Sequence, residues 1–227
     1  MTLRIVVPDG ALRAPSLELF AAAGFSGDGE EAGEAPFAPA GANASPSLGV
    51  AALDVRLAVV AANDVPAYLA SGAADAGLVA KDALLERATR LCELLDLRFG
   101  GAQLVYAVAP GADARAERLG RLRIATRHPA LTRSFFAARG LQVTVVEVGG
   151  ALDRVASDGL ADGVVTLVET PAGQTAPAVV AGLTVEGVVA ESTIRLVAGR
   201  GARVLHGAEL GVLVARLRDL IAGRAAT

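Results

Sequence analysis

Short runs rich in valine, leucine and isoleucine alternate along this chain with segments that have helical spacing of apolar residues. Strands are expected at 3–7, 55–60, 76–79, 103–109, 123–125, 143–148, 163–168, 184–189 and 194–198. Helices are expected at 14–23, from 64–66 onward, and at 81–88, 131–138, 151–157 and 208–222. This order predicts α/β layers around a mainly parallel sheet. No internal repeat is apparent.

The segment 26–47 departs from this alternation. It consists mainly of Gly, Ala, Pro, Ser and Glu and has hardly any large apolar residue. Such a composition cannot bury enough surface to offset the entropy lost on ordering. We expect an irregular loop that is dispensable for folding.

Composition excludes several classes of protein. The chain has 227 residues and 53% hydrophobic residues, but no apolar run of the length that a bilayer span needs. The amino terminus lacks the apolar region of a signal peptide, which favours a cytoplasmic location. A net charge of −3 argues against nucleic acid as a partner. Cys92, His128 and His206 are too few to build a metal cluster, and we expect all three to be ordinary packing or surface residues.

Three groups of short segments, spread over nearly the whole chain, resemble the ATP phosphoribosyltransferases in order and spacing. The first is DVPAY at 64–68, GAADAGLV at 72–79, KD at 81–82 and LLDL at 94–97. The second is RIAT at 123–126, HP at 128–129 and LTR at 131–133. The third is GLAD at 159–162 and LVET at 167–170.

The resemblance implies a fold and a domain arrangement. The fold would be α/β and two-lobed, like the type II periplasmic binding proteins, with an interlobe cleft. Lobe I would comprise residues 1–98 plus 190–227, and lobe II residues 99–189. The length is that of the short form of the family, which lacks the carboxy-terminal histidine-binding domain.

The resemblance also implies an activity. The family joins N1 of the ATP adenine to the ribose of phosphoribosyl pyrophosphate and releases pyrophosphate, the first step of histidine biosynthesis. Magnesium (Mg2+) would arrive bound to the substrates, with no metal site made by the protein. We expect a homo-oligomer, with a regulatory subunit that resembles a histidyl-tRNA synthetase as an additional partner.

The phosphoribosyl-binding loop of the family follows the strand that ends here at Val168. Residues expected to bind phosphoribosyl pyrophosphate are Glu169, Thr170, Ala172, Gly173, Gln174 and Thr175. We expect this loop to lie at the amino end of a helix, where backbone amides bind anions. Two residues depart from the family pattern: Thr166 replaces an aspartate, and Pro171 replaces a glycine and removes one amide donor.

Other residues are expected to bind nucleotide or phosphate, and no catalytic residue is assigned. They are Asp9, Gly10, Lys81, Asp82 and Asp153. The family's cations are missing from the PDGA turn at 8–11 and from AAND at 61–64. Candidates to replace those cations are Lys81, Arg123, Arg127, Arg133 and Arg154.

The missing cations leave two alternatives to an ATP phosphoribosyltransferase open. One is a diverged paralogue that acts on a related purine nucleotide. The other is a noncatalytic ligand-binding or regulatory homologue that kept the fold and lost the chemistry. A transport solute-binding protein is disfavoured because no export signal or lipidation cysteine is seen at the amino terminus.

Overall fold

A computed structural model describes most of the chain. The described residues are 2–25, 48–50, 53–87, 90–109, 122–150, 152, 154–155, 158–170, 174–177, 179–180 and 182–225. The chain divides into two compact units. The first contains residues 1–80, 89–98 and 194–227, and the second contains residues 81–88 and 99–193. The expected lobes differ from these units mainly in the short helix after residue 80, which belongs to the second unit.

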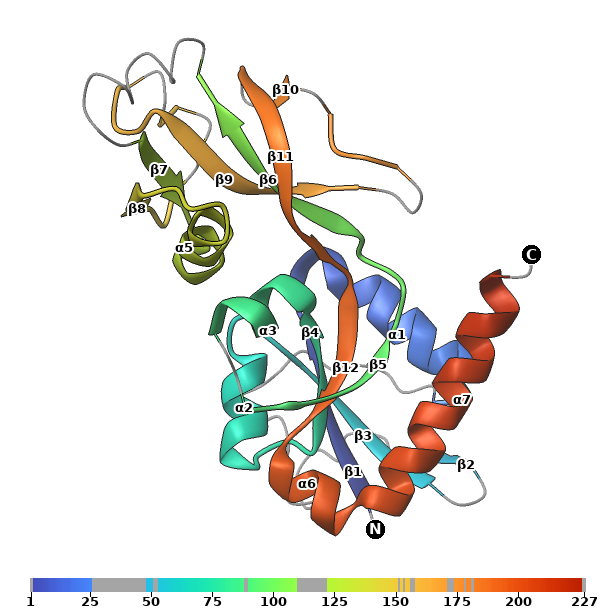
Figure 1. Cartoon of the computed structure of the whole chain (residues 1–227). Helices are drawn as coiled ribbons and strands as arrows, with labels where there is room; N and C mark the ends of the chain where they lie inside the picture. The colour runs from blue at the N-terminus through green and yellow to red at the C-terminus, as the bar shows by residue number, and fades with distance from the viewer. Residues whose placement is uncertain are drawn as a thin grey trace. The chain divides into compact units, whose positions relative to one another are not determined.

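The first unit is built on a sheet with the strand order β2-β3-β1-β4-β12-β5 (Figure 1). Its strands are β1 (Thr2–Pro8), β2 (Leu48–Val50), β3 (Leu53–Val60), β4 (Ala76–Ala80), β5 (Cys92–Asp96) and β12 (Ile194–Ala198). β1 pairs in parallel with β3 and β4, whereas β12 runs antiparallel to β4 and β5. Its helices are η1 (Gly10–Leu12), α1 (Arg13–Ala22), α2 (Val65–Ser71), α6 (Arg200–Leu205) and α7 (Gly207–Ala225).

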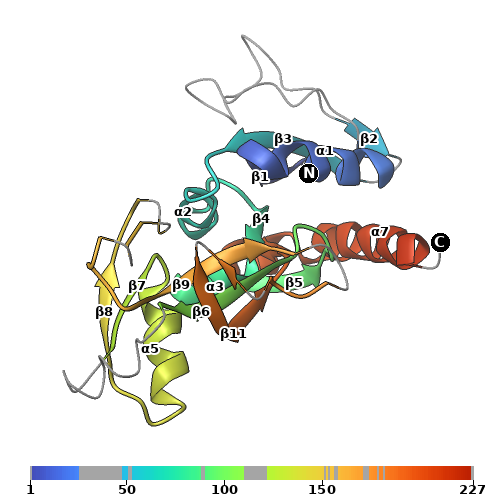
Figure 2. The ribbon, with the colours of Figure 1, turned by 90° about the horizontal axis from the view of Figure 1, so that it is seen from above.

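Apolar side chains of this first sheet and its helices form a closed core. Leu3, Ile5 and Leu196 on the strands are fully buried, as are Phe20 on α1 and Leu213 on α7. The helix α1 packs against β1 (Figure 2). The helix α1 ends where Gly24 takes φ +83°, a conformation that glycine adopts without steric cost.

The second unit has a sheet with the order β10-β11-β6-β9-β7-β8. The strands are β6 (Ala102–Val108), β7 (Leu122–Thr126), β8 (Val143–Glu147), β9 (Gly163–Glu169), β10 (Val179–Val180) and β11 (Leu183–Ser192). Its helices are α3 (Lys81–Arg87) and α5 (Pro129–Ala137). Phe136 on α5 is buried and meets Tyr106 edge-on, with ring centroids 4.9 Å apart. This aromatic contact fixes α5 on the sheet.

Both sheets are mixed, so the expected mainly parallel sheet is wrong. β7 pairs in parallel with β8 and β9, but β6 runs antiparallel to β9 and β11. The reason is connectivity: β11 and β12 follow one another directly, and each runs against the strands beside it. The element order alone could not reveal these antiparallel strands.

The observed helices and strands differ from the expected ones in several places. The strand β5 and the helix α6 were not expected. The helix expected at 151–157 and the loop expected at 26–47 fall wholly or largely outside the described residues. Asp64 precedes α2 as expected, but its side chain makes no capping hydrogen bond. Within the described part of the chain, none of the helices combines the length and apolar character that a membrane crossing requires.

An arginine–aspartate contact recurs in the same place in each sheet. In the first unit, Asp75 accepts hydrogen bonds from the backbone N–H and the guanidinium of Arg4. In the second, Asp162 accepts the same set from Arg123. Leu-Arg-Ile and Ala-Asp surround both pairs in sequence. Each unit therefore has two neighbouring parallel strands, β1 and β4 in the first and β7 and β9 in the second, that are held together at one end by an ion pair.

Candidate functional site

The Lys-Asp pair expected to bind phosphate opens the helix α3 of the second unit. The Lys81 N–H donates to the Thr193 carbonyl over 3.0 Å, which ties the start of α3 to the end of β11. Asp82 lies in the first turn, where a carboxylate interacts favourably with the helix dipole. Its side chain is buried, so its hydrogen-bond partners decide what it can do.

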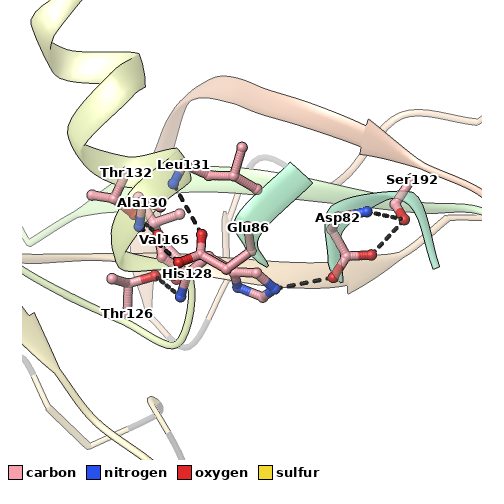
Figure 3. Close-up of polar contacts among 9 residues, drawn as sticks. All are labelled: Asp82, Glu86, Thr126, His128, Ala130, Leu131, Thr132, Val165 and Ser192. Carbon is pink, nitrogen blue, oxygen red and sulfur yellow. Dashed lines mark hydrogen bonds and ion pairs between the residues drawn. The ribbon is translucent and has the colours of Figure 1, made fainter. Parts of the chain in front are cut away.

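Asp82 connects a serine and a histidine that are distant in sequence (Figure 3). The Ser192 hydroxyl donates to Asp82 Oδ1 over 2.5 Å, and Ser192 Oγ accepts the Asp82 N–H over 3.1 Å. On the other carboxylate oxygen, His128 Nε2 lies 3.0 Å from Asp82 Oδ2. Because an ionised carboxylate can only accept, Nε2 carries the proton. The carboxylate is thus held between β11 and the start of α5.

The protonation of Asp82 follows from these contacts. Burial is the largest influence and by itself would raise the pKa of the Asp82 carboxyl group. The hydrogen bonds from His128 and Ser192, the electrostatic attraction of His128 and the hydrogen bond from the Asp82 backbone together outweigh burial, so the pKa lies below its ordinary value. Asp82 is therefore ionised at neutral pH.

A second carboxylate of α3 caps α5. Glu86 Oε1 accepts the Ala130 N–H over 2.7 Å, and Oε2 accepts the Leu131 N–H over 2.9 Å. These amides belong to the first turn of α5 and have no partner within the helix. Asp82 and Glu86 are one helical turn apart, so α3 presents both carboxylates to the start of α5.

A chain of hydrogen bonds extends this network into the sheet. The Thr126 hydroxyl accepts the His128 N–H over 2.9 Å and donates to the Val165 carbonyl over 2.9 Å. The Thr132 hydroxyl donates to the His128 carbonyl over 2.7 Å. The His128 backbone is thereby fixed, and His128 Nδ1 is buried with no hydrogen-bond partner in the described part of the chain.

This arrangement positions groups and is not a hydrolytic triad. In a Ser-His-Asp triad the histidine takes the proton of the serine. Here Ser192 donates to the carboxylate, so the imidazole cannot act as its base. The network instead fixes the start of α3, where Lys81 begins the helix, against β11 and α5.

The loop expected to bind phosphoribosyl pyrophosphate begins at the same end of this sheet. Glu169 is the last residue of β9 and is exposed, and Thr170 is buried with its N–H bonded to the Gly101 carbonyl over 2.9 Å. Through the register of the sheet, Glu169 and Ser192 both pair with Ala102. Two strand spacings put them about 10 Å apart. The structure thus brings Glu169 and Thr170 to the edge that holds Lys81 and Asp82.

The rest of this loop differs from the expectation. Ala172 and Gly173 lie outside the described residues. Gln174 and Thr175 are exposed and irregular, the Ala176 N–H donates to Gln103 Oε1 over 2.9 Å, and the strand β10 follows. The helix expected after the loop is therefore wrong. Pro177 and the β-branched pair at 179–180 oppose helix formation, so no helix is present in the described residues 174–177 and 179–180.

The other expected phosphate-binding residues are separate from this edge. Asp9 and Gly10 follow β1 in the first unit, where the Asp9 N–H donates to the Val60 carbonyl over 2.8 Å. Gly10 has φ +82°, which makes glycine the favoured residue at this turn. Asp153 lies outside the described residues.

The candidates to replace the missing cations are engaged to different degrees. The Arg123 guanidinium is bound by Asp162, and Arg127 donates twice to the Gly150 carbonyl. Arg154 is exposed beside Asp158 at 3.8 Å, and Arg133 is exposed. Arg123 is therefore a structural cation, which corrects its place among the candidates. Lys81 remains a candidate. It lies at the end of the second sheet that also holds Asp82, Glu169 and Thr170, which we call the polar edge.

Sequence reasoning missed His128, Ser192 and Glu86. We expected His128 to be an ordinary packing or surface residue, but it is a hydrogen-bonded part of the network. The Ser-Thr pair that ends β11 gives no local signal, and Ser192 is 110 residues from Asp82. No cluster of three or more His, Cys, Asp and Glu side chains in the described ranges is arranged to hold a metal ion.

Sequence comparison places this site in a known context. Residues 61–219 match the family model HisG, described as ATP phosphoribosyltransferase. The chain is 38% identical to an ATP phosphoribosyltransferase of Symbiobacterium thermophilum over 172 residues, which are 75% of this chain and 76% of the relative. It is 40% identical to that of Thermus thermophilus over 172 residues, 76% of this chain and 77% of the relative.

Solved structures agree on the fold. The ATP phosphoribosyl transferase (HisG:HisZ) complex from Thermotoga maritima contains a chain that superposes with a TM-score of 0.70 at 21% identity, covering 97% of this chain and 99% of that one. The periplasmic aliphatic sulphonate binding protein SsuA from Escherichia coli superposes with a TM-score of 0.52 at 16% identity, covering 97% of this chain and 72% of that one. These likenesses concern the fold alone, and they confirm the expected two-lobed α/β class.

Proposed function

The chain belongs to the ATP phosphoribosyltransferase family, and from this membership we propose that it joins ATP to phosphoribosyl pyrophosphate and releases pyrophosphate. The observation that carries the proposal is the polar edge of the second unit. There the family-like Lys81-Asp82 pair and the family-like Glu169-Thr170 loop meet at one end of the same sheet.

The proposed step is a substitution at C1 of the ribose. The lone pair on N1 of the adenine forms the new bond to C1 as the bond from C1 to the pyrophosphate oxygen breaks. Pyrophosphate leaves with the bonding electrons, and the exocyclic amino group of the adenine then gives up one proton. The reaction needs orientation of two anions and stabilisation of the leaving group more than covalent help from the protein.

We assign binding roles to the residues at this edge. The exposed Glu169 carboxylate would accept hydrogen bonds from the ribose hydroxyls, because an ionised carboxylate is only an acceptor. The hydroxyls of Thr170 and Thr175 and the amides of Ala172, Gly173 and Gln174 would bind the 5′-phosphate. Lys81 would supply positive charge, and Asp82 would position α3.

Further nucleotide contacts are proposed from the sequence alone, for Asp9, Gly10 and Asp153. Mg2+ would neutralise charge on the pyrophosphate oxygens. The residues that the structure describes offer no three-ligand cluster for it. We therefore propose that the ion is held mainly by the substrates, as hard cations with few protein ligands commonly are.

We further propose that this reaction serves histidine biosynthesis in the cytoplasm, where both substrates are made. The neighbour from Thermotoga maritima is a HisG:HisZ complex. By that analogy we propose a regulatory subunit of the HisZ type, similar to a histidyl-tRNA synthetase. We also propose that the chain assembles as a homo-oligomer, which sedimentation of the 22.8 kDa chain would reveal.

The test of the proposed loop is Glu169→Gln, with Glu186→Gln on β11 as the matched exposed control. Loss of charged hydrogen bonds of about 1.5–3 kcal/mol corresponds to roughly a 10- to 100-fold weaker interaction with phosphoribosyl pyrophosphate. Steady-state kinetics should show a raised KM for that substrate in Glu169→Gln alone. An unchanged KM would remove the loop from the site.

A further inference from the structure

The first unit contains a pocket at the end of its sheet opposite Asp9 and Gly10. It encloses about 740 Å³, within the rough range of 300–1,000 Å³ for small-molecule sites. Its walls come from the start of β1, the last turn of α2, the segment before β4, the residues before β5, and α6. Figure 1 shows α6 beside the beginning of β1. Every wall belongs to the first unit, so the pocket is independent of the edge described above.

One ion pair in this pocket is already complete. Asp75 receives two hydrogen bonds from the Arg4 guanidinium and a third from the Arg4 N–H. Arg4 also donates to the Gly72 carbonyl over 2.8 Å. The negative charge of Asp75 is therefore balanced by Arg4.

Two further arginines of the pocket have no acidic partner among the described residues. Arg90, just before β5, and Arg200, the first residue of α6, both line the pocket. Both are exposed, and neither forms an ion pair with any residue in the described ranges. Two guanidinium groups beside one concave surface suit an anionic ligand, because guanidinium binds carboxylate and phosphate groups with paired hydrogen bonds.

His206 adds a polar atom that the protein does not satisfy. Its ring lines the pocket, and its Nδ1 is buried without a hydrogen-bond partner among the described residues. Its Nε2 lies 3.9 Å from Asp75 Oδ1, which is too long for a hydrogen bond. Buried polar atoms are normally paired, so the hydrogen-bonding capacity of this imidazole is unused among the described residues.

Most of the remaining lining is apolar. Pro66 and Leu69 of α2, Ala74 before β4, Leu91 before β5, and Leu205 of α6 contribute to it. Sites for organic ligands combine such an apolar wall with a few polar groups that fix orientation. An ion as small as free phosphate would leave this wall uncovered.

We propose that this pocket binds a small organic anion, namely a carboxylate or phosphate group carried on an apolar ring or chain. Arg90 and Arg200 bind the anionic head, His206 contributes a hydrogen bond, and the apolar wall covers the body of the ligand. Nothing in this proposal depends on the transferase reaction.

The test uses two anionic probes and one neutral analogue in calorimetric titrations without substrates. The probes are 2-naphthoate and phenyl phosphate, and the analogue is 2-naphthamide. We expect saturable binding of at least one anion, and the tighter probe identifies the head group. The amide should bind at least about tenfold more weakly, since charge-assisted hydrogen bonds are the strong ones.

Substitutions of residues that line the pocket test whether the anion binds there. Arg90→Gln and Arg200→Gln should each weaken the anion about tenfold, whereas Arg203→Gln, on α6 but outside the pocket, should not. A Cβ on Gly201 meets no atom within 4 Å, so Gly201→Trp fills the pocket without a backbone clash, and Gly201→Ala is its control. Ala70→Trp fills the pocket from α2.

We expect both tryptophan variants to abolish binding while they melt near the wild-type temperature. The proposal is overturned if neither anion binds the wild-type protein, if 2-naphthamide binds as tightly as 2-naphthoate, or if a folded tryptophan variant keeps wild-type affinity.

Discussion

Asp82 is the side chain on which the network of the second unit depends. It is buried, and it holds Ser192 on one oxygen and His128 on the other. Asp82→Asn removes the negative charge. Its NH2 group cannot accept a hydrogen bond, so Ser192 or His128 loses its acceptor. We expect the free energy of unfolding to fall by about 1.5–3 kcal/mol. Asp158→Asn, in the exposed pair with Arg154, should change it by less than about 0.5 kcal/mol, as urea denaturation can measure.

A second prediction for Asp82 concerns the free energy of unfolding at acidic pH. Its pKa is lowered in the folded protein, so its ionised form stabilises the fold above the unfolded pKa of about 3.9. That contribution is lost as pH falls through the lower folded pKa. The difference in unfolding free energy between wild type and Asp82→Asn should therefore shrink as pH falls from about 5 to 2. A difference that stays constant over this range would contradict the pKa assignment.

Single residues of the site were predictable only where sequence neighbours carried the signal. Lys81-Asp82 and Glu169-Thr170 stand next to family-like segments, and the structure brings both pairs to one edge. His128 and Ser192 are 46 and 110 residues from Asp82. No local pattern links residues so far apart, because only the fold brings them together.

The cap that α3 places on α5 can be tested at the scale of the element. Glu86 accepts two amides of the first turn of α5, so Glu86→Ala leaves both without a partner. We expect a loss of about 0.5–2 kcal/mol in unfolding free energy, the usual cost of removing a helix cap. Glu18→Ala, exposed on α1, is the control and should be close to neutral. Equal effects of the two changes would show that the Glu86 contacts contribute nothing.

The start of the proposed phosphoribosyl-binding loop depends on a close approach between two segments. A Cβ on Gly101 would lie 2.7 Å from the Thr170 carbonyl oxygen, so an alanine there displaces one backbone from the other. We expect Gly101→Ala to destabilise the protein by about 1–3 kcal/mol and to weaken binding of phosphoribosyl pyrophosphate. At Gly149 a Cβ meets nothing within 4 Å, so Gly149→Ala is the control. Calorimetric titration of both variants would detect the difference, and wild-type affinity in Gly101→Ala would contradict it.

Elements with strong periodicity were predictable, and those without it were not. β1, β3, β4 and α7 lie where the sequence placed them, within a few residues. β5 was missed because it carries Glu93 and Asp96, which both pair with Arg195 of β12. α6 has only six residues, too short for a helical period. The helix expected after Glu169 was inferred from the family pattern, but Val179 and Val180 form the strand β10 instead.

At the scale of the whole molecule, the sequence supported the two-lobed α/β class but not the mixed sheets. Antiparallel pairs arise both at consecutive strands of one sheet, as in β2–β3 and β10–β11, and where consecutive strands such as β11 and β12 belong to different sheets. Hydrophobic patterns do not report which sheet a strand joins. The same limit hid the shared arginine–aspartate motif, which becomes visible when Arg4–Asp75 and Arg123–Asp162 are compared in three dimensions.

The measurement that tests the central claim most directly is pyrophosphate release by the whole chain. It should be followed with phosphoribosyl pyrophosphate and ATP together, with each alone, and with other purine nucleotides, in the presence and absence of a HisZ-type subunit. We predict release that requires both substrates and is greatest with ATP. Binding of phosphoribosyl pyrophosphate without any release, even with the subunit present, would contradict the account and identify a noncatalytic homologue.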